Sequence, residues 1–161
     1  MSSSNPAESS ALADTTDESK QNGAKFQTVL EHLYNSYNSY KSCAEDCTDP
    51  VLQGVFQTIS KIRSDFIGQL SSVIRNELGL EPVTSSSGLG KAHETWIDVK
   101  ACCVDGRSKA SVIAKVHRGE SNLIDQYEAV LSEGKILNKT IRKVLQEQLK
   151  TIREQNATIC V

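Results

Sequence analysis

The sequence predicts an all-α protein, an antiparallel four-helix bundle with an extra short helix between its second and third long helices. Apolar residues recur at steps of three and four along four long segments, which is typical of helices that bury one face. The first two segments are joined by a very short link, so they must fold back on each other. No segment alternates apolar and polar residues for long enough to predict a strand.

The beginning of the chain differs in composition from the rest. Residues 1–24 are rich in Ser, Thr, Asp, Glu and Asn and contain almost nothing to bury, which predicts a disordered tail before a helical domain over 25–161. The tail carries four acidic residues and one basic residue, whereas the remainder carries 16 acidic and 17 basic residues. Because the net charge is only -2, we expect neither nucleic acid nor a membrane as a partner.

The first predicted helix begins at Lys25 and runs to about Cys47. Its apolar face is regular and ends in a row of tyrosines, which we interpret as the edge of the core or an interface. The residues of this face are Phe26, Val29, Leu30, Leu33, Tyr34, Tyr37 and Tyr40.

The second predicted helix has clear signals at both ends. Asp49 can cap its first turn and Pro50 suits the first helical position. A long apolar stripe then runs over 51–78, and Gly79 is a natural C-terminal cap.

The connection to the third long helix is unusually long. A loop over 81–88 leads to a short helical piece over 89–103, and Ser108 can cap the third long helix. The last helix carries apolar residues over 137–152. A link of roughly 25 residues is long for a bundle, where most links have about 2–8. It predicts the crossover between helices 2 and 3 of a ferritin-like bundle.

Several short stretches, in a fixed order, lead to a family. They are Thr48-Asp49-Pro50 with Leu52 and Phe56, Arg63 to Phe66, Gly90-x-x-His93-x-x-Trp96-x-Asp98-x-Lys100, Arg118-Gly119-Glu120 with Tyr127, and Gln148. From about Leu30 to Ile152 the chain thereby resembles a bacterial domain-of-unknown-function family described as ferritin-like four-helix-bundle proteins. The resemblance implies this fold and a distant kinship with ferritins, but no reaction.

Ferritin-like di-iron sites take a Glu from each of two helices and a Glu-x-x-His pair from each of the other two. The chain has three histidines, His32, His93 and His117, and none follows a Glu by three positions. In the last helix, where the family often has a His, this sequence has Asn156. We therefore expect no cofactor and no catalytic residues.

Glu120 nevertheless falls on the apolar stripe of the third long helix. Because a buried acid must be paired or ligating, two interpretations stay open. In the favoured one, Glu120 bonds inside the bundle, to a Tyr hydroxyl, Gln148 or Arg63. In the other, it is a remnant ligand for iron or another divalent metal. The further ligands would then be His117, Glu45 and Glu147.

A second open interpretation is a small-ligand carrier, since bundles house ligands between helices. Its pocket would be lined by His93, Trp96, Tyr127 and Gln148. The structural alternative is that Trp96 seals one end of the core.

The remaining signals favour a non-catalytic binding protein. The chain lacks a phosphate-binding glycine loop and a nucleophile elbow. It also has no apolar run of membrane-spanning length, no signal-peptide pattern and an odd number of cysteines, five. We expect a cytoplasmic homodimer with a role in stress or storage, whose protein partner the sequence does not name.

Overall fold

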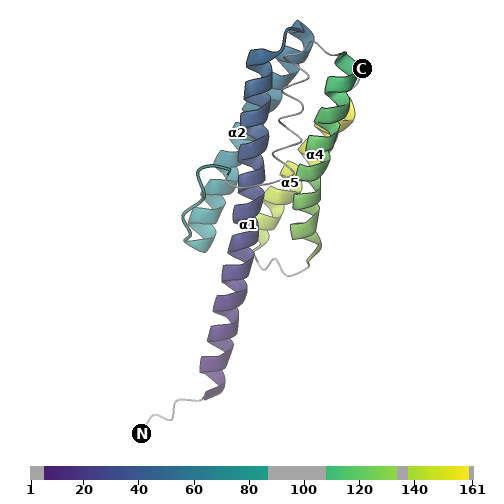
Figure 1. Ribbon diagram of the computed structural model, residues 1–161. Coiled ribbons are helices and arrows are strands. Elements are labelled where there is room, and N and C mark those ends of the chain that lie inside the picture. Colours follow the sequence, from purple (N-terminus) through teal and green to yellow (C-terminus); the bar gives the residue numbers. More distant parts are fainter. Residues whose placement is uncertain (1–5, 87–107, 134–137, 160–161) are drawn as a thin grey trace.

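The computed structural model describes residues 6–86, 108–133 and 138–159. These ranges contain four long helices and no strand, which confirms the predicted all-α class (Figure 1). The helices are α1 (Pro6–Asp46), α2 (Pro50–Leu78), α4 (Lys109–Ser132) and α5 (Lys139–Thr158). The predicted short helix over 89–103 lies outside the described residues.

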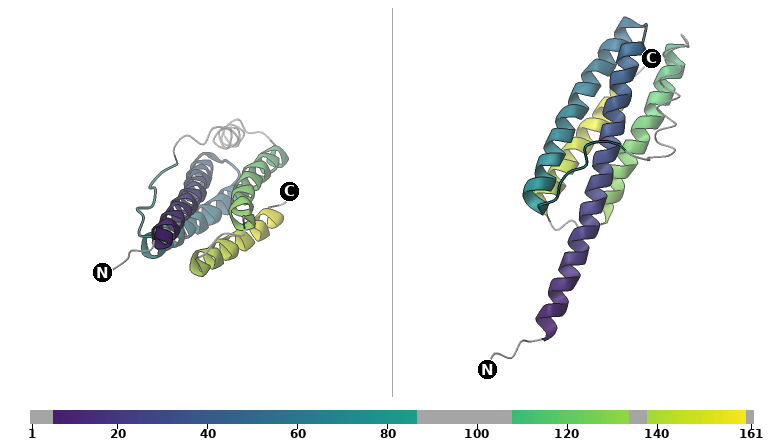
Figure 2. Two further views of the ribbon diagram at one scale, coloured as in Figure 1. Left: turned by 90° about the horizontal axis from the view of Figure 1, so that it is seen from below. Right: turned by 60° about the vertical axis from the view of Figure 1, so that its left-hand side comes forward.

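The four helices form two hairpins, α1–α2 and α4–α5, that pack against each other (Figure 2). Lys25 of α1 pairs with Glu133 beyond the end of α4, so these two helices are antiparallel. Asn138, before α5, bonds Glu77 near the end of α2, so this pair is antiparallel too. Hence α2 and α4 run in the same direction, which requires the long crossover of a ferritin-like bundle.

The helix ends confirm the sequence signals. The Asp49 carboxylate accepts hydrogen bonds from two backbone N–H groups of the first turn of α2, at 2.9 and 3.2 Å. Pro50 is the first residue of that helix, and Gly79 closes it with a left-handed φ of 63°. Ser108 and Asn138 cap α4 and α5 in the same way.

The start of α1 differs from the prediction. The sequence predicts a first helix that begins at Lys25, whereas α1 begins at Pro6 and projects beyond the other described helices (Figures 1 and 2). Once a helix is nucleated by its packed part, each further residue adds at low cost, because nucleation and not propagation is the unfavourable step. Gly23 is closely packed, because a Cβ at this position would lie 2.6 Å from Leu80 Cδ1. The division into a tail and a domain stays a prediction.

The interior consists of two apolar clusters separated by polar side chains. The far-end cluster lies away from the α1–α2 turn and is built around Leu30, Leu33, Leu70, Ile74, Tyr127, Ile141, Leu145 and Ile152. The turn-end cluster lies beside that turn and contains Tyr40, Cys43, Ala44, Leu52, Phe56, Ile59, Val112, Ile113, Val116 and Ile159.

Candidate functional site

A polar layer crosses the bundle between the two clusters. All four helices contribute, and each member lies on the apolar face of its helix. We define the layer as Ser36 and Tyr40 of α1, Arg63 of α2, Glu120 of α4 and Gln155 of α5. Arg63 and Glu120 are both 0% exposed.

An ion pair forms the centre of the layer. Arg63 Nη2 donates to Glu120 Oε2 at 2.8 Å, and Tyr40 Oη donates to the other carboxylate oxygen at 2.5 Å. The other two guanidinium nitrogens donate hydrogen bonds to side chains of α5 and α1. Its Nη1 donates to Gln155 Oε1 at 2.9 Å and its Nε to Ser36 Oγ at 3.3 Å. One cation thus links all four helices.

Aromatic rings complete the surroundings of the guanidinium. Arg63 Cζ lies 5.9 Å from the centre of the Tyr40 ring and 5.8 Å from that of Phe66. A planar, delocalised cation is suited to such contacts. Within the described ranges, no buried side-chain nitrogen or oxygen lacks a hydrogen-bond partner. The layer is therefore a satisfied network, which a buried charge requires in order to be tolerated.

The tyrosine hydroxyls of this region stay protonated over a wide pH range. Burial raises the pKa of Tyr40 well above its usual 10.0, and the negative charge of Glu120 raises it further. Burial also raises the pKa of Tyr127. Both groups therefore act as neutral hydrogen-bond donors rather than as bases.

A second polar contact lies deeper in the far-end cluster. Tyr127 Oη donates to Gln148 Oε1 at 2.8 Å. The amide nitrogen of Gln148 donates in turn to the Phe66 carbonyl and to Gln69 Oε1, both at 3.2 Å. This contact ties α4 to α5 and α5 to α2.

The structure places the proposed metal ligands in different environments. Glu120 is fully buried, whereas Glu45 and Glu147 are exposed. His117 is half-buried, and its Nδ1 lies 2.5 Å from Asn156 Oδ1. In the part of the chain that the structure describes, no three His, Cys, Asp or Glu side chains converge as a metal site would require.

The donor chemistry of the layer does not fit a ferritin-type metal centre. Such a centre needs several carboxylates and imidazoles from the four helices. The layer offers one carboxylate, Glu120, and both of its oxygens already accept hydrogen bonds. Beside it stands Arg63, a permanent cation.

The predicted ligand pocket is only partly covered by the described residues. His93 and Trp96 lie outside them. Tyr127 and Gln148 are in contact, as the prediction requires, but both side chains are buried in the interior.

From the sequence we expected a Tyr hydroxyl, Gln148 or Arg63 as the partner of Glu120. In the structure Glu120 bonds Tyr40 and Arg63. Gln148 instead bonds Tyr127, the Phe66 carbonyl and Gln69. Ser36 and Gln155 were missed. The signal was present, because each takes a place on the apolar face of its helix: Ser36 lies three residues after Leu33, and Gln155 three after Ile152.

Comparisons with known proteins agree with this architecture. A family model described as a domain of unknown function (DUF2383) matches residues 21–133. A search of curated proteins finds no significant match. Among solved structures, the bacterioferritin-related protein of Bacteroides fragilis, described as a dodecameric thioferritin, is similar with a TM-score of 0.66 at 15% identity. The match covers 88% of this chain and 83% of that chain.

Proposed function

Because the chain belongs to the DUF2383 family and has a ferritin-like fold, we propose that it is a non-catalytic binding protein whose bundle needs no metal centre. The observation that carries the proposal is the fully buried Arg63–Glu120 pair in the middle of the four helices. In a ferritin-type centre, that region collects carboxylates and imidazoles around two metal ions. In this chain the Arg63 guanidinium supplies the positive charge that pairs with the buried Glu120 carboxylate.

Electrostatics supports the proposal. A divalent ion about 4 Å from the Arg63 guanidinium would be repelled by roughly 8 kcal/mol at an effective dielectric constant of about 20. The ion would also have to displace the hydrogen bonds that Glu120 accepts from Arg63 and Tyr40. Within the layer, Glu120 is the one carboxylate that could balance the charge of such an ion.

The test is elemental analysis of protein purified without chelator or metal-affinity steps, combined with thermal unfolding with and without EDTA. We expect well below one metal ion per chain and an unchanged Tm in EDTA. Near-stoichiometric metal that disappears in a folded Glu120→Gln variant would overturn the proposal.

The alternative is a divergent iron-binding protein. The similar Bacteroides fragilis protein is described as a thioferritin, and Glu120 is a buried carboxylate in a similar fold. The ligands of this alternative would be Glu120, His117, Glu45 and Glu147. It predicts that His117→Ala lowers the iron content of the purified protein, whereas the favoured function predicts no change.

Self-association is part of the proposal. From the sequence we expect a homodimer, whereas the similar bacterial protein is described as a dodecamer. Sedimentation velocity distinguishes a dimer from a larger closed assembly or a monomer. A cytoplasmic location and a role in stress or storage are likewise proposals. Within the described ranges, no helix has the length and hydropathy needed to cross a membrane.

A further inference from the structure

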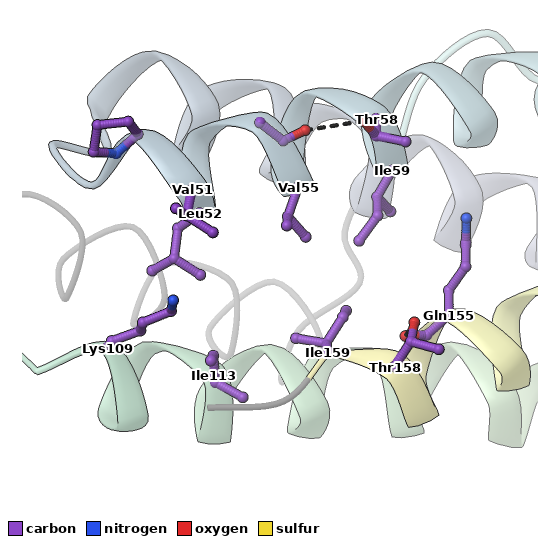
Figure 3. A pocket seen from close by; sticks show the side chains of 12 residues that line it. Val51, Leu52, Val55, Thr58, Ile59, Lys109, Ile113, Gln155, Thr158 and Ile159 are labelled. Atoms are coloured by element: carbon purple, nitrogen blue, oxygen red, sulfur yellow. Dashed lines mark hydrogen bonds between the residues drawn. The ribbon is translucent and has the colours of Figure 1, made fainter.

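A cavity of about 660 Å³ opens at the turn end of the bundle, between α2, α4 and the last turn of α5 (Figure 3). Its origin lies in the helix lengths. The helix α5 ends at Thr158, and beyond Gln155 only Ile159 of the described residues belongs to the turn-end cluster. Among the described helices, α1, α2 and α4 therefore enclose this end. The volume is within the range of about 300–1,000 Å³ that is typical of small-molecule sites.

The walls of this cavity are aliphatic. Side chains from α2 and α4 point toward each other across the space, and Ile159 points into it from the end of α5 (Figure 3). The main apolar contributors are Leu52, Val55, Ile59, Ile113 and Ile159. No aromatic ring is among the described lining residues, so the cavity suits a flexible hydrocarbon chain rather than a stacked planar ligand.

Three polar groups of the lining, the Thr58 and Thr158 hydroxyls and the Gln155 side-chain oxygen, already take part in hydrogen bonds. The Thr58 hydroxyl donates to the Gly54 carbonyl, and Gln155 accepts from Arg63. Lys109 is the one charged residue among the described lining residues, and within the described part of the chain no acid pairs with it. It stands in the first turn of α4, which contains no acidic residue and has a positive dipole end. Both features favour an anion at this place.

Gly54 is the one glycine among the described residues that line the cavity. It lies inside α2, where glycine destabilises a helix by about 1 kcal/mol relative to alanine. A Cβ at this position would meet no atom within 4 Å. Gly54 is exposed and lines the cavity, so a larger side chain at this position has room to extend.

We propose that this cavity binds a single-chain aliphatic carboxylate, with the carboxylate on Lys109 and the hydrocarbon chain between α2 and α4. The inference gives the proposed binding role a ligand class and rests on that role. It uses residues outside the proposed metal set, so its failure would not decide the metal question.

The experiment is calorimetric titration of the full chain with decanoate and, separately, with 1-decanol, both below their aggregation limits. We expect saturable binding of one decanoate per chain, about fivefold tighter than 1-decanol, as one partly exposed ion pair allows. In a Lys109→Met variant the two ligands should bind equally. Equal binding of both ligands to the unsubstituted protein would overturn the role of Lys109, and absence of decanoate binding would overturn the site.

Matched glycine variants locate the site. Gly54→Leu should weaken decanoate binding more than tenfold, because its side chain occupies the cavity. Gly68→Leu is the control, since Gly68 lies in the same helix, is exposed, has open space at its Cβ and does not line the cavity. We expect its binding within twofold of the unsubstituted protein. Equal effects of the two variants would overturn the proposal. A changed sedimentation coefficient in Gly54→Leu alone, without decanoate binding, would assign the cavity to a second copy of the chain.

Discussion

The two ends of the bundle differ in how completely they are filled. At the far end all four helices meet, and α5 contributes Ile141, Leu145 and Ile152, each 0% exposed. At the turn end α5 has ended, Ile159 is the one described residue after it, and a cavity of about 660 Å³ opens. The polar layer lies between the ends. One fold therefore combines a well-filled end with an incompletely filled one, and a charged layer separates them.

Removing the positive charge of Arg63 from the polar layer should lower the free energy of unfolding more than the other changes described below. Arg63→Met leaves Glu120 buried without its counter-ion, which costs about 3–5 kcal/mol. We expect this loss in the free energy of unfolding, measured by urea denaturation.

The matched control for that variant is Arg63→Met combined with Glu120→Gln. The neutral amide still accepts from Tyr40, so the double variant should recover about half of the loss. If it were as unstable as Arg63→Met alone, the packing of the guanidinium stem, and not the unpaired charge, would explain the effect.

The same substitution, Ile to Ala, made at each end of the bundle tests whether the far end is packed more completely than the turn end. Ile74→Ala at the far end should cost about 4 kcal/mol, because a sealed core leaves a new cavity. Ile59→Ala at the turn end should cost about 2 kcal/mol, since Ile59 already borders open space and loses fewer contacts. The measurement is urea unfolding of both variants. Equal costs would contradict the proposed difference between the ends.

Alkaline pH should weaken the bundle through the tyrosines of the interior. The folded-state pKa values of Tyr40 and Tyr127 lie above the unfolded value of 10.0. Their stabilisation is therefore complete below pH 10 and is lost as the pH rises above it, by about 1.4 kcal/mol per pH unit for each residue. Unfolding curves between pH 9 and 11 should show a shallower decline for Tyr40→Phe than for the unsubstituted protein. An identical slope would mean that the Tyr40 hydroxyl is not sequestered.

The smallest expected change in stability concerns Gly54, which lines the cavity at the turn end. Gly54→Ala should stabilise the protein by about 0.5–1 kcal/mol, because it lowers the backbone entropy of the unfolded chain and meets no atom in the fold. Thermal unfolding with a rise in Tm would confirm this. A fall in Tm would show that the α2 wall is closed at this position.

The fold could be predicted because its signals are local. Asp49, Pro50 and Gly79 mark the ends of α2 through hydrogen bonds and φ values that involve only their neighbours. The apolar spacing of three and four residues then identified the buried faces, and the long link after α2 identified the crossover. The resemblance to a ferritin-like family pointed the same way, and the matches to known proteins support it.

The candidate site was predictable only in part, because its contacts join residues far apart in sequence. A carboxylate on an apolar stripe predicts that Glu120 has a partner, and the partners Arg63 and a Tyr hydroxyl were among the candidates considered. That Ser36 and Gln155 would join them depends on how the four helices align, which no single segment encodes. The early start of α1 at Pro6 was also missed, since composition describes what a segment can bury and not whether a packed helix extends into it.

The polar layer also has a consequence for how the sequence can change. A slide of α4 by one turn, about 5.4 Å, would carry the Glu120 carboxylate past Arg63 into an apolar cluster, so the layer selects one alignment of the helices. Residues added at the outer end of a helix, as in the long projection of α1, leave this alignment intact. A single residue inserted between Leu33 and Ser36 would turn the rest of α1 by about 100° and rotate Tyr40 out of the interior. The chain can therefore gain or lose length at its helix ends, but not next to the layer.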